Sequence, residues 1–496
     1  LYEGYSVVLL ETLNYHKFCL CSDVAPLREV GKNFVEYINP HHPKEWAEKI
    51  ISLLKDKKAL KQKEDYIKKN WHTPTWKDST QELYNYLSSL SVPAVLSNSD
   101  TPKVYYDLSL IFFKGGLSGI PRTEMLLARY LYRIRRDIIF FTLQKGKYIE
   151  IPSQKLSHLL SDEKLDSSVA EDMLHLTMLP SKELPFKNSD VVFSAGVGFD
   201  PKSFELVYEA HQKIGFTYCH VLYDLTPITV PHTHPQERVK VYPSYLHAIY
   251  ALSDFIFYGG KTAQSDSEKY QKSTGLHPVR SEAVKWGSDI ASSEDYKTSK
   301  EAVFTKYGIK GDFLLTVGTI EARKNQQVLY EAYLELLKIQ HKGEKLPQLI
   351  ICGHPGWKTA SFMNILNTDS RIKNKVIFIT PEDDELDILY RNCKFTLLAS
   401  FYEGWSLTLP ESLNYGKFCL TSDTPSLKET GEDIVDYANP YDPVEWAEKI
   451  KYYLKHPDEL KKREVLIKQK WHNTTWLECA QNISKTLDKL LKEKKQ

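Results

Sequence analysis

Long apolar runs and an excess of charge of either sign are both missing from this 496-residue sequence. No run approaches the roughly 18 to 20 apolar residues that a membrane-spanning helix needs, and no charged-then-apolar signal segment opens the chain. The 65 Lys and Arg residues against 64 Asp and Glu leave a formal net charge of +1. That charge creates no global field for nucleic acid or an anionic membrane. We therefore expect no nucleic-acid partner and at most peripheral contact with a membrane.

Paired-cysteine motifs are also missing. The seven cysteines are scattered through apolar surroundings, and Cys19 and Cys21 are separated by one residue. This spacing is wrong for a zinc knuckle or a thioredoxin-like pair. No Asp-x-Asp motif or histidine cluster argues for a metal site. The composition predicts a folded protein of the reducing cytoplasm, in contact at most with the inner face of the cytoplasmic membrane.

What the sequence does contain is a long internal repeat. The segment LYEGYSVVLLETLNYHKFCLCSD from Leu1 matches FYEGWSLTLPESLNYGKFCLTSD from Phe401, and the register holds without a gap to Trp71 and Trp471. About half of the aligned positions are identical. Because this period is far too long for a solenoid, it predicts two tandem copies of one large module.

In this interpretation the sequence begins inside a motif, and residues 1–92 are the C-terminal fragment of an upstream copy. Residues 93–102 are short, polar and turn-rich, as linkers are. Glu3 and Glu11 of the fragment match Glu403 and Glu411, but nothing before Leu1 supplies a basic pair. We therefore expect the fragment to be inactive and to need partners for an exposed sheet edge.

The complete copy, residues 103–496, alternates short apolar segments with amphipathic ones, the pattern of parallel α/β sheets. A division near residues 290–300 gives each half its own set of strands. The predicted strands are 104–113, 138–142, 191–195, 217–223, 255–258, 313–317, 348–352, 376–379 and 395–399. Predicted helices include 122–133, 325–340 and 443–454.

The first segment with chemical content is 318–325, Gly-Thr-Ile-Glu-Ala-Arg-Lys-Asn, between an apolar strand and a helix. Ligands of open α/β sheets bind beyond the carboxyl ends of strands, where glycine permits close approach and helix N-termini favour anions. Arg323 and Lys324 are therefore candidates to meet a diphosphate. The alternative is a solvated basic pair at a helix start, which the helix dipole slightly disfavours.

The second segment is 403–411, Glu-Gly-Trp-Ser-Leu-Thr-Leu-Pro-Glu, which follows another apolar strand. We expect Glu403 before a tight glycine turn and Glu411 a little over two turns into a helix. Ionised carboxylates accept hydrogen bonds from vicinal sugar hydroxyls, and the free N–H groups of residues 404–407 can hold a pyrophosphate. Two surface acids of an amphipathic helix are the alternative.

These two segments, together with Gly-His-Pro-Gly-Trp at 353–357 and Ser-Phe-Tyr-Glu-Gly-Trp-Ser at 400–406, resemble in order and spacing the retaining GT-B glycosyltransferases of family four. The resemblance is greatest to bacterial mannosyl- and rhamnosyltransferases of O-antigen and capsule, and it covers residues 103–480. It implies two Rossmann-like domains facing a cleft, preceded by the partial Rossmann-like fragment. The expected domains are an acceptor-side domain at 103–295, a donor domain at 296–475, and a helix at 476–496 that packs back on the acceptor-side domain.

The resemblance also implies residue roles. Arg323 and Lys324 would neutralise the departing diphosphate, Glu403 would hold hydroxyls of the transferred sugar, and Glu411 would hold the ribose. No metal or other cofactor is implied, because the basic pair and a helix N-terminus replace a divalent cation. The implied donor-binding residues are Gly318, Arg323, Lys324, Glu403, Gly404, Trp405, Ser406, Leu407, Glu411 and Gly116.

Two segments of the N-terminal half complete the candidate site. Lys114-Gly-Gly-Leu-Ser-Gly-Ile-Pro-Arg-Thr123 resembles the glycine-rich loop that such enzymes bring to the donor phosphates, although a plain strand-to-helix turn is the alternative. Asp224 lies in a segment resembling the family's His-Asp-x-x-Pro, with Tyr223 at the histidine position. Asp224 is a candidate to position the sugar or acceptor hydroxyl, and a capping role is the alternative. His232 and His234 are expected to be loop residues rather than ligands.

The sequence thus predicts a retaining glycosyltransferase of bacterial surface polysaccharide synthesis. It would move a hexose or deoxyhexose, with mannose from GDP-mannose favoured, to a glycan or lipid-linked glycan acceptor. Other biosynthetic enzymes are candidate partners. The competing hypothesis is a non-catalytic, glycosyltransferase-like scaffold that binds a glycan or a partner transferase.

Overall fold

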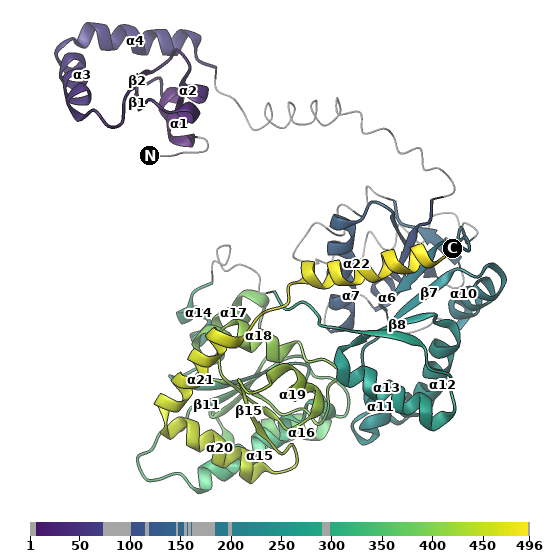
Figure 1. Ribbon diagram of the computed structural model, residues 1–496. Coiled ribbons are helices and arrows are strands. Elements are labelled where there is room, and N and C mark those ends of the chain that lie inside the picture. Colours follow the sequence, from purple (N-terminus) through teal and green to yellow (C-terminus); the bar gives the residue numbers. More distant parts are fainter. Residues whose placement is uncertain are drawn as a thin grey trace. The chain divides into compact units, whose positions relative to one another are not determined.

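The computed structural model divides the chain into two compact units, Leu1–Thr101 and Pro102–Gln496 (Figure 1). It describes residues 6–72, 101–114, 119–144, 147–152, 184–196, 201–289 and 298–494, together with Leu156 and Leu160. The second unit contains one seven-stranded and one six-stranded sheet, so the prediction of two parallel α/β domains is confirmed. We name these the seven-stranded and the six-stranded domain.

The seven-stranded sheet has the order β5-β4-β3-β6-β7-β8-β9, and every neighbouring pair is parallel except β4 and β5. Its inner strands are mostly apolar because helices cover both faces of a parallel sheet. Its strands are β3 (Val104–Asp107), β4 (Ile138–Gln144), β5 (Lys147–Glu150), β6 (Val191–Ser194), β7 (Thr217–Leu222), β8 (Phe255–Gly259) and β9 (Arg280–Val284). Its helices are α6 (Ser109–Lys114), α7 (Ile120–Ile134), α10 (Pro201–Ile214), α11 (Thr226–Thr229), the 3-10 turn η1 (Pro231–Thr233), α12 (Gln236–Leu252) and α13 (Gly260–Thr274).

The predicted strand 104–113 is wrong in its second half. The strand ends at Asp107, whose carboxylate accepts hydrogen bonds from the backbone N–H and the hydroxyl of Ser109. These bonds begin helix α6. The apolar pattern continues through the break because α6 is itself buried, with Leu110 and Ile111 at most 4% exposed.

The six-stranded sheet is parallel throughout, with the order β12-β11-β10-β13-β14-β15. The chain runs from β10 outward to β12 and returns to β13 on the other side of β10. The loops after β10 and β13 therefore leave from neighbouring strands at the point where the strand order reverses, which is where open α/β sheets bind ligands. Its strands are β10 (Phe313–Val317), β11 (Gln348–Cys352), β12 (Val376–Ile379), β13 (Thr396–Leu398), β14 (Cys419–Ser422) and β15 (Asp436–Ala438).

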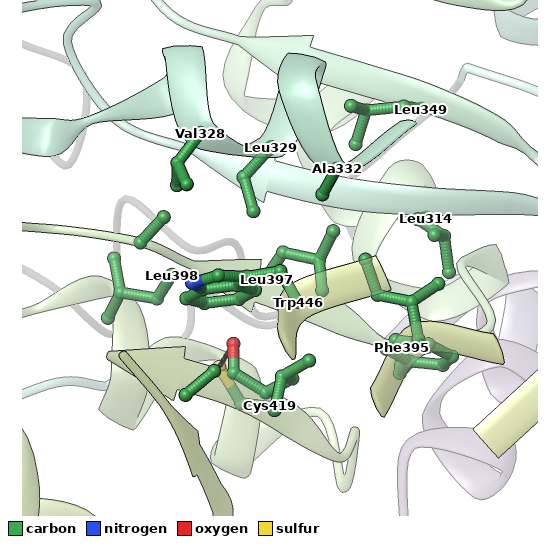
Figure 2. Packing of buried hydrophobic residues seen from close by; sticks show 14 of the residues in the cluster. Leu314, Val328, Leu329, Ala332, Leu349, Phe395, Leu397, Leu398, Cys419 and Trp446 are labelled. Atoms are coloured by element: carbon green, nitrogen blue, oxygen red, sulfur yellow. Dashed lines mark hydrogen bonds between the residues drawn. The ribbon is translucent and has the colours of Figure 1, made fainter. Parts of the chain in front are cut away.

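Helices on both faces bury this sheet. They are α14 (Lys300–Tyr307), the 3-10 turns η3 (Ala322–Lys324) and η4 (Ser370–Ile372), α15 (Gln326–Lys338), α16 (Ala360–Thr368), α17 (Asp383–Asn392), α18 (Thr408–Asn414), α19 (Pro425–Gly431), α20 (Pro443–Lys455) and α21 (Pro457–Lys470). Figure 2 shows the indole of Trp446, from α20, among side chains of α15 and strand β13. Trp446 is 0% exposed and donates from Nε1 to the carbonyl oxygen of Asn439, 3.0 Å away.

Helix α22 (Trp476–Glu493) leaves the six-stranded domain and packs on α7, β6 and β9 of the seven-stranded domain (Figure 1). Arg135, at the end of α7, donates to Asp488 (2.7 Å) and to the hydroxyl of Ser484 (2.9 Å). The helix therefore ties the end of the chain to the other domain. Within the described residues, no helix combines the length and the apolar character that crossing a membrane requires.

The first unit repeats the last part of the six-stranded domain element by element. Its strands are β1 (Leu20–Ser22) and β2 (Glu36–Ile38), and its helices are α1 (Val7–Asn14), α2 (Ala25–Gly31), α3 (Pro43–Lys55) and α4 (Lys57–Asn70). Trp46 donates to the carbonyl of Asn39 as Trp446 does to that of Asn439. The packing differs, because residues 6–72 hold no counterpart of α15. Ile50 is 44% exposed, whereas Ile450 is 2% exposed.

This difference predicts unequal effects of two matched substitutions. Trp446→Ala removes a fully buried indole and should destabilise the second unit by about 3–5 kcal/mol. Trp46→Ala removes a half-buried side chain and should cost about 1 kcal/mol or less. Differential scanning calorimetry of both variants checks this expectation. Equal losses of stability would contradict the packing described for α3 and α20.

Candidate active site

Glycines bring the loops after β10 and β11 into backbone contact. Gly318 has φ +138° and Gly353 has φ +153°, and a Cβ added to Gly353 would lie 2.1 Å from the Gly318 carbonyl oxygen. The Gly318 N–H also donates to the Cys352 carbonyl. A side chain at Gly353 would push the two loops apart, and the φ angle of Gly318 is one that favours glycine. The close approach fixes the start of segment 318–325 and hence the position of its basic pair.

Arg323 and Lys324 lie in η3 and both reach Glu403 in the loop after β13. The Arg323 guanidinium is 2.5 Å from Glu403 Oε2, and Lys324 Nζ is 2.6 Å from Glu403 Oε1. Arg323 also contacts Glu321 Oε1 at 2.6 Å and the Tyr402 carbonyl at 2.9 Å. Both cationic side chains are 13% exposed. The alternative interpretation of a solvated basic pair is therefore wrong.

The pKa values follow from burial and from the charges of this cluster. Burial alone would raise the pKa of Glu403, but Arg323 and Lys324 outweigh it and lower the value to about 2. Burial raises the pKa of Glu321 more than its cations lower it. The pKa of Arg323 is raised, because Glu403 and Glu321 outweigh the effect of its burial. Glu403 is consequently ionised at neutral pH and can only accept hydrogen bonds.

Glu411 lies in the first turn of α18, which begins at Thr408. The prediction that it lies more than two turns into a helix is wrong, because residues 404–407 precede the helix. Glu411 Oε2 accepts from the Tyr390 hydroxyl at 3.2 Å, and Oε1 is 3.7 Å from the guanidinium of Arg122 on α7. Burial raises the pKa of Glu411, and the charges of Arg122 and Lys324 oppose that shift. Lys324 thus acts on both carboxylates of the segment.

Residues Gly404 and Trp405 dock on the seven-stranded domain. A Cβ added to Gly404 would lie 2.3 Å from the Tyr223 carbonyl oxygen and 2.5 Å from Asp224 Cβ, so only glycine fits there. Trp405 packs over Gly260, whose added Cβ would lie 2.9 Å from the indole. The segment that carries Glu403 is therefore held directly against the carboxyl ends of β7 and β8.

The remaining predicted residues surround this junction. Asp224 Oδ1 accepts hydrogen bonds from the N–H (3.0 Å) and the hydroxyl (2.8 Å) of Thr226. This oxygen therefore has the capping role that was the alternative for Asp224. The Ser406 hydroxyl lies 3.0 Å from that of Thr408. Leu407 packs against the core of the seven-stranded domain. Gly116 lies outside the described residues, so its predicted role stays a prediction.

His234 is the residue that sequence reasoning undervalued. It lies in a loop, as expected, but it is 3% exposed and its ring stacks on Trp357 at 5.9 Å between centroids. Neither ring nitrogen has a hydrogen-bond partner among the residues that the structure describes. Burial lowers its pKa to about 4, and the charge of Arg323 adds to this effect. A neutral imidazole therefore stands near the cluster, and no signal along the chain distinguishes it from an exposed loop histidine.

The opposite pKa shifts of the two carboxylates predict opposite pH dependence. Glu403 has a folded pKa of about 2 against an ordinary 4.5, so its contribution to stability is present above pH 4.5 and is lost as pH falls through 2. At pH 7, Glu403→Gln should destabilise the second unit by about 3 kcal/mol because Arg323 and Lys324 lose their shared partner. The deficit should shrink toward pH 2.

Glu411→Gln is the matched control. Because the folded pKa of Glu411 is raised, its protonation stabilises the fold below the ordinary value, and this contribution is lost as pH rises through the folded pKa. The variant should therefore cost little stability at pH 7. Unfolding temperatures measured from pH 2 to pH 8 give both comparisons. A Glu403→Gln deficit that does not change with pH would contradict the ion-pair assignment.

Solved structures of other proteins share this fold at low sequence identity. Sucrose-phosphate synthase from Thermosynechococcus elongatus superposes with a TM-score of 0.54 at 14% identity, covering 79% of this chain and 100% of that chain. HepE of Anabaena, solved in complex with UDP, gives 0.52 at 15% identity and covers 78% and 100%. These structures identify the fold as GT-B.

Two curated relatives match at the sequence level. The O-antigen chain mannosyltransferase B of Escherichia coli is 26% identical over 225 residues, which are 44% of this chain and 56% of the relative. The serotype-specific mannosyltransferase WbdA of Escherichia coli is 28% identical over 152 residues, 30% of this chain and 18% of the relative. The chain therefore spans about half of the first relative and a smaller part of the second.

Residues 299–471 match the family Glycosyl transferases group 1. The match covers the six-stranded domain, which holds Arg323, Lys324, Glu403 and Glu411, and the chain has a GT-B fold.

Proposed function

We propose that this chain transfers a sugar from a nucleotide-sugar donor to a glycan acceptor in bacterial surface polysaccharide synthesis. The observation that carries the proposal is the buried cluster of Arg323, Lys324 and Glu403 at the strand-order reversal of the six-stranded sheet. The family match over the same domain supports it, as do the names of the two mannosyltransferase relatives.

The roles we propose follow from the chemistry of each group. Lys324 and Arg323 stabilise the charge that develops on the diphosphate as the glycosidic bond breaks. Such charge stabilisation is strong in a site removed from water. Glu403, ionised at neutral pH, accepts hydrogen bonds from hydroxyls of the transferred sugar, and Glu411 accepts them from the ribose. Arg323 and Lys324 both contact Glu403 in the structure, so a bound diphosphate would share these cations with Glu403.

We further propose that the anomeric configuration is retained by displacement on one face of the sugar, with the departing phosphate taking the proton of the acceptor hydroxyl. A pKa of about 2 makes Glu403 unsuited to donate a proton at neutral pH. The proposal therefore gives Glu403 a hydrogen-bond-accepting role and needs no carboxylic acid as proton donor.

The donor we favour is GDP-mannose, because both curated relatives are named mannosyltransferases. Deoxysugars activated by GDP or dTDP come next. We propose a glycan or lipid-linked glycan as acceptor, in the cytoplasm or at the inner face of its membrane. We also propose that no metal or other cofactor takes part, because two cations already stand where the leaving group's charge would form.

The test is a panel of GDP-, UDP- and dTDP-sugars, with and without EDTA, followed by thermal shift and donor hydrolysis. One nucleotide class should stabilise the protein and turn over, and EDTA should change neither result. In Lys324→Ala, kcat/KM should fall about 100-fold or more. The matched control is Lys338→Ala, which removes an exposed lysine paired with Glu335 and should leave kcat/KM unchanged. Absence of binding to every donor would favour the non-catalytic scaffold, and loss of turnover with EDTA would contradict metal independence.

A further inference from the structure

Arg122 belongs to the seven-stranded domain but contacts Glu411, a candidate donor-binding carboxylate of the six-stranded domain. No other ion pair among the described residues joins the seven-stranded domain to a candidate carboxylate. The Arg122 guanidinium lies 3.7 Å from Glu411 Oε1, and its side chain is 52% exposed. The contacts of Arg323 and Lys324 with their carboxylates are much shorter, at 2.5–2.6 Å. Arg122 is therefore the most loosely held and most accessible of the three cations.

The charge balance shows why a third cation matters. Arg122, Arg323 and Lys324 face three carboxylates, those of Glu321, Glu403 and Glu411. Asp224 adds a further negative charge that acts on Arg323. A diphosphate brings about two more negative charges, so its entry is opposed less with Arg122 present than it would be without it.

Three of the five N–H groups of Arg323 already have acceptors, which leaves two for a new ligand. One terminal nitrogen donates to Glu403 and to the Tyr402 carbonyl, and the other donates to Glu321. These contacts are buried, and breaking them would leave carboxylates without partners. Arg122 has no comparable cost, because its single described partner is 3.7 Å away and its guanidinium is half exposed to water.

Both carboxylate oxygens of Glu411 also have partners in the structure. One oxygen accepts from Tyr390 and the other faces Arg122. A hydroxyl pair that binds this carboxylate would replace Arg122 at Oε1. The Arg122 guanidinium would then be free to bind another group of the same ligand.

We propose that Arg122 is a phosphate-binding residue supplied by the seven-stranded domain. It pairs with Glu411 before the donor binds and turns to the donor diphosphate on binding. This inference rests on the proposed function. The ligand is a nucleoside diphosphate, whose hydroxyls take over Glu411 and whose phosphates receive Arg122. Arginine suits this exchange because its planar fork binds carboxylate and phosphate in the same way.

The test compares the affinities of Arg122→Ala, Arg122→Lys and wild type for GDP, UDP and dTDP and for the matching nucleosides, by isothermal titration calorimetry. For the nucleotide that wild type binds, Arg122→Ala should weaken diphosphate binding about tenfold or more. Nucleoside binding should be unchanged or tighter, because Glu411 loses a competitor. Arg122→Lys should restore part of the loss. Arg133→Ala, which removes an exposed arginine of the same helix, should match wild type.

The ratio of diphosphate to nucleoside affinity is the decisive readout, since a merely structural role would weaken both equally. An unchanged ratio in Arg122→Ala, with wild type binding a nucleotide, would overturn this inference and leave the proposed function standing. Wild-type protein that binds none of the three nucleotides would overturn both. Unfolding temperatures without ligand check that each variant is folded.

Discussion

The buried ion pairs that join the loops after β10 and β13 are the interaction on which the candidate site depends. Glu403, 5% exposed, forms ion pairs with both Arg323 and Lys324. Glu321 forms a second ion pair with Arg323. Opposite charges removed from water are tolerated only when each has a partner, because one unpaired buried charge costs several kcal/mol. The sheet order makes the cluster possible, since β10 and β13 are neighbours and their loops leave from the same edge.

The same segment also connects the two domains. Gly404 lies against the Tyr223 backbone, and the hydroxyl of Tyr402 donates to Asp266 of α13. Glu429 accepts from the backbone N–H groups of Lys261 and Thr262 at the start of that helix. Helix α22 adds a third connection through Arg135. The segment that carries Glu403 is therefore in contact with both domains, and a ligand bound to Glu403 would lie at their junction.

The sequence predicted those strands whose bounds are set by a local pattern of apolar and polar residues. Strands 313–317, 348–352 and 376–379 were predicted at their observed bounds, because buried parallel strands are apolar runs that end at polar loops. The same property hid the break at Asp107, where a buried strand is followed by a buried helix. The helix of Glu411 was predicted to begin too early, since residues 404–407 are used for docking on the other domain.

Partners that come from another part of the chain could not be predicted in this way. The contact between Arg122 and Glu411 joins two domains, and the stacking of His234 on Trp357 does so as well. Glu321 lies within segment 318–325, but nothing in the sequence predicts that Arg323 lies between the carboxylates of Glu321 and Glu403. The pattern of residues along one helix or strand does not predict contacts with a residue far away in the sequence.

The most direct measurement is a crystal structure of the chain with a bound nucleoside diphosphate. The account predicts that the diphosphate contacts Lys324 at the junction of the two domains, with Glu403 still paired to Arg323 and with Arg122 moved from Glu411 to the phosphates. A nucleotide bound elsewhere, with Lys324 and Arg122 in their present contacts, would contradict the assignment of this cluster as the donor site.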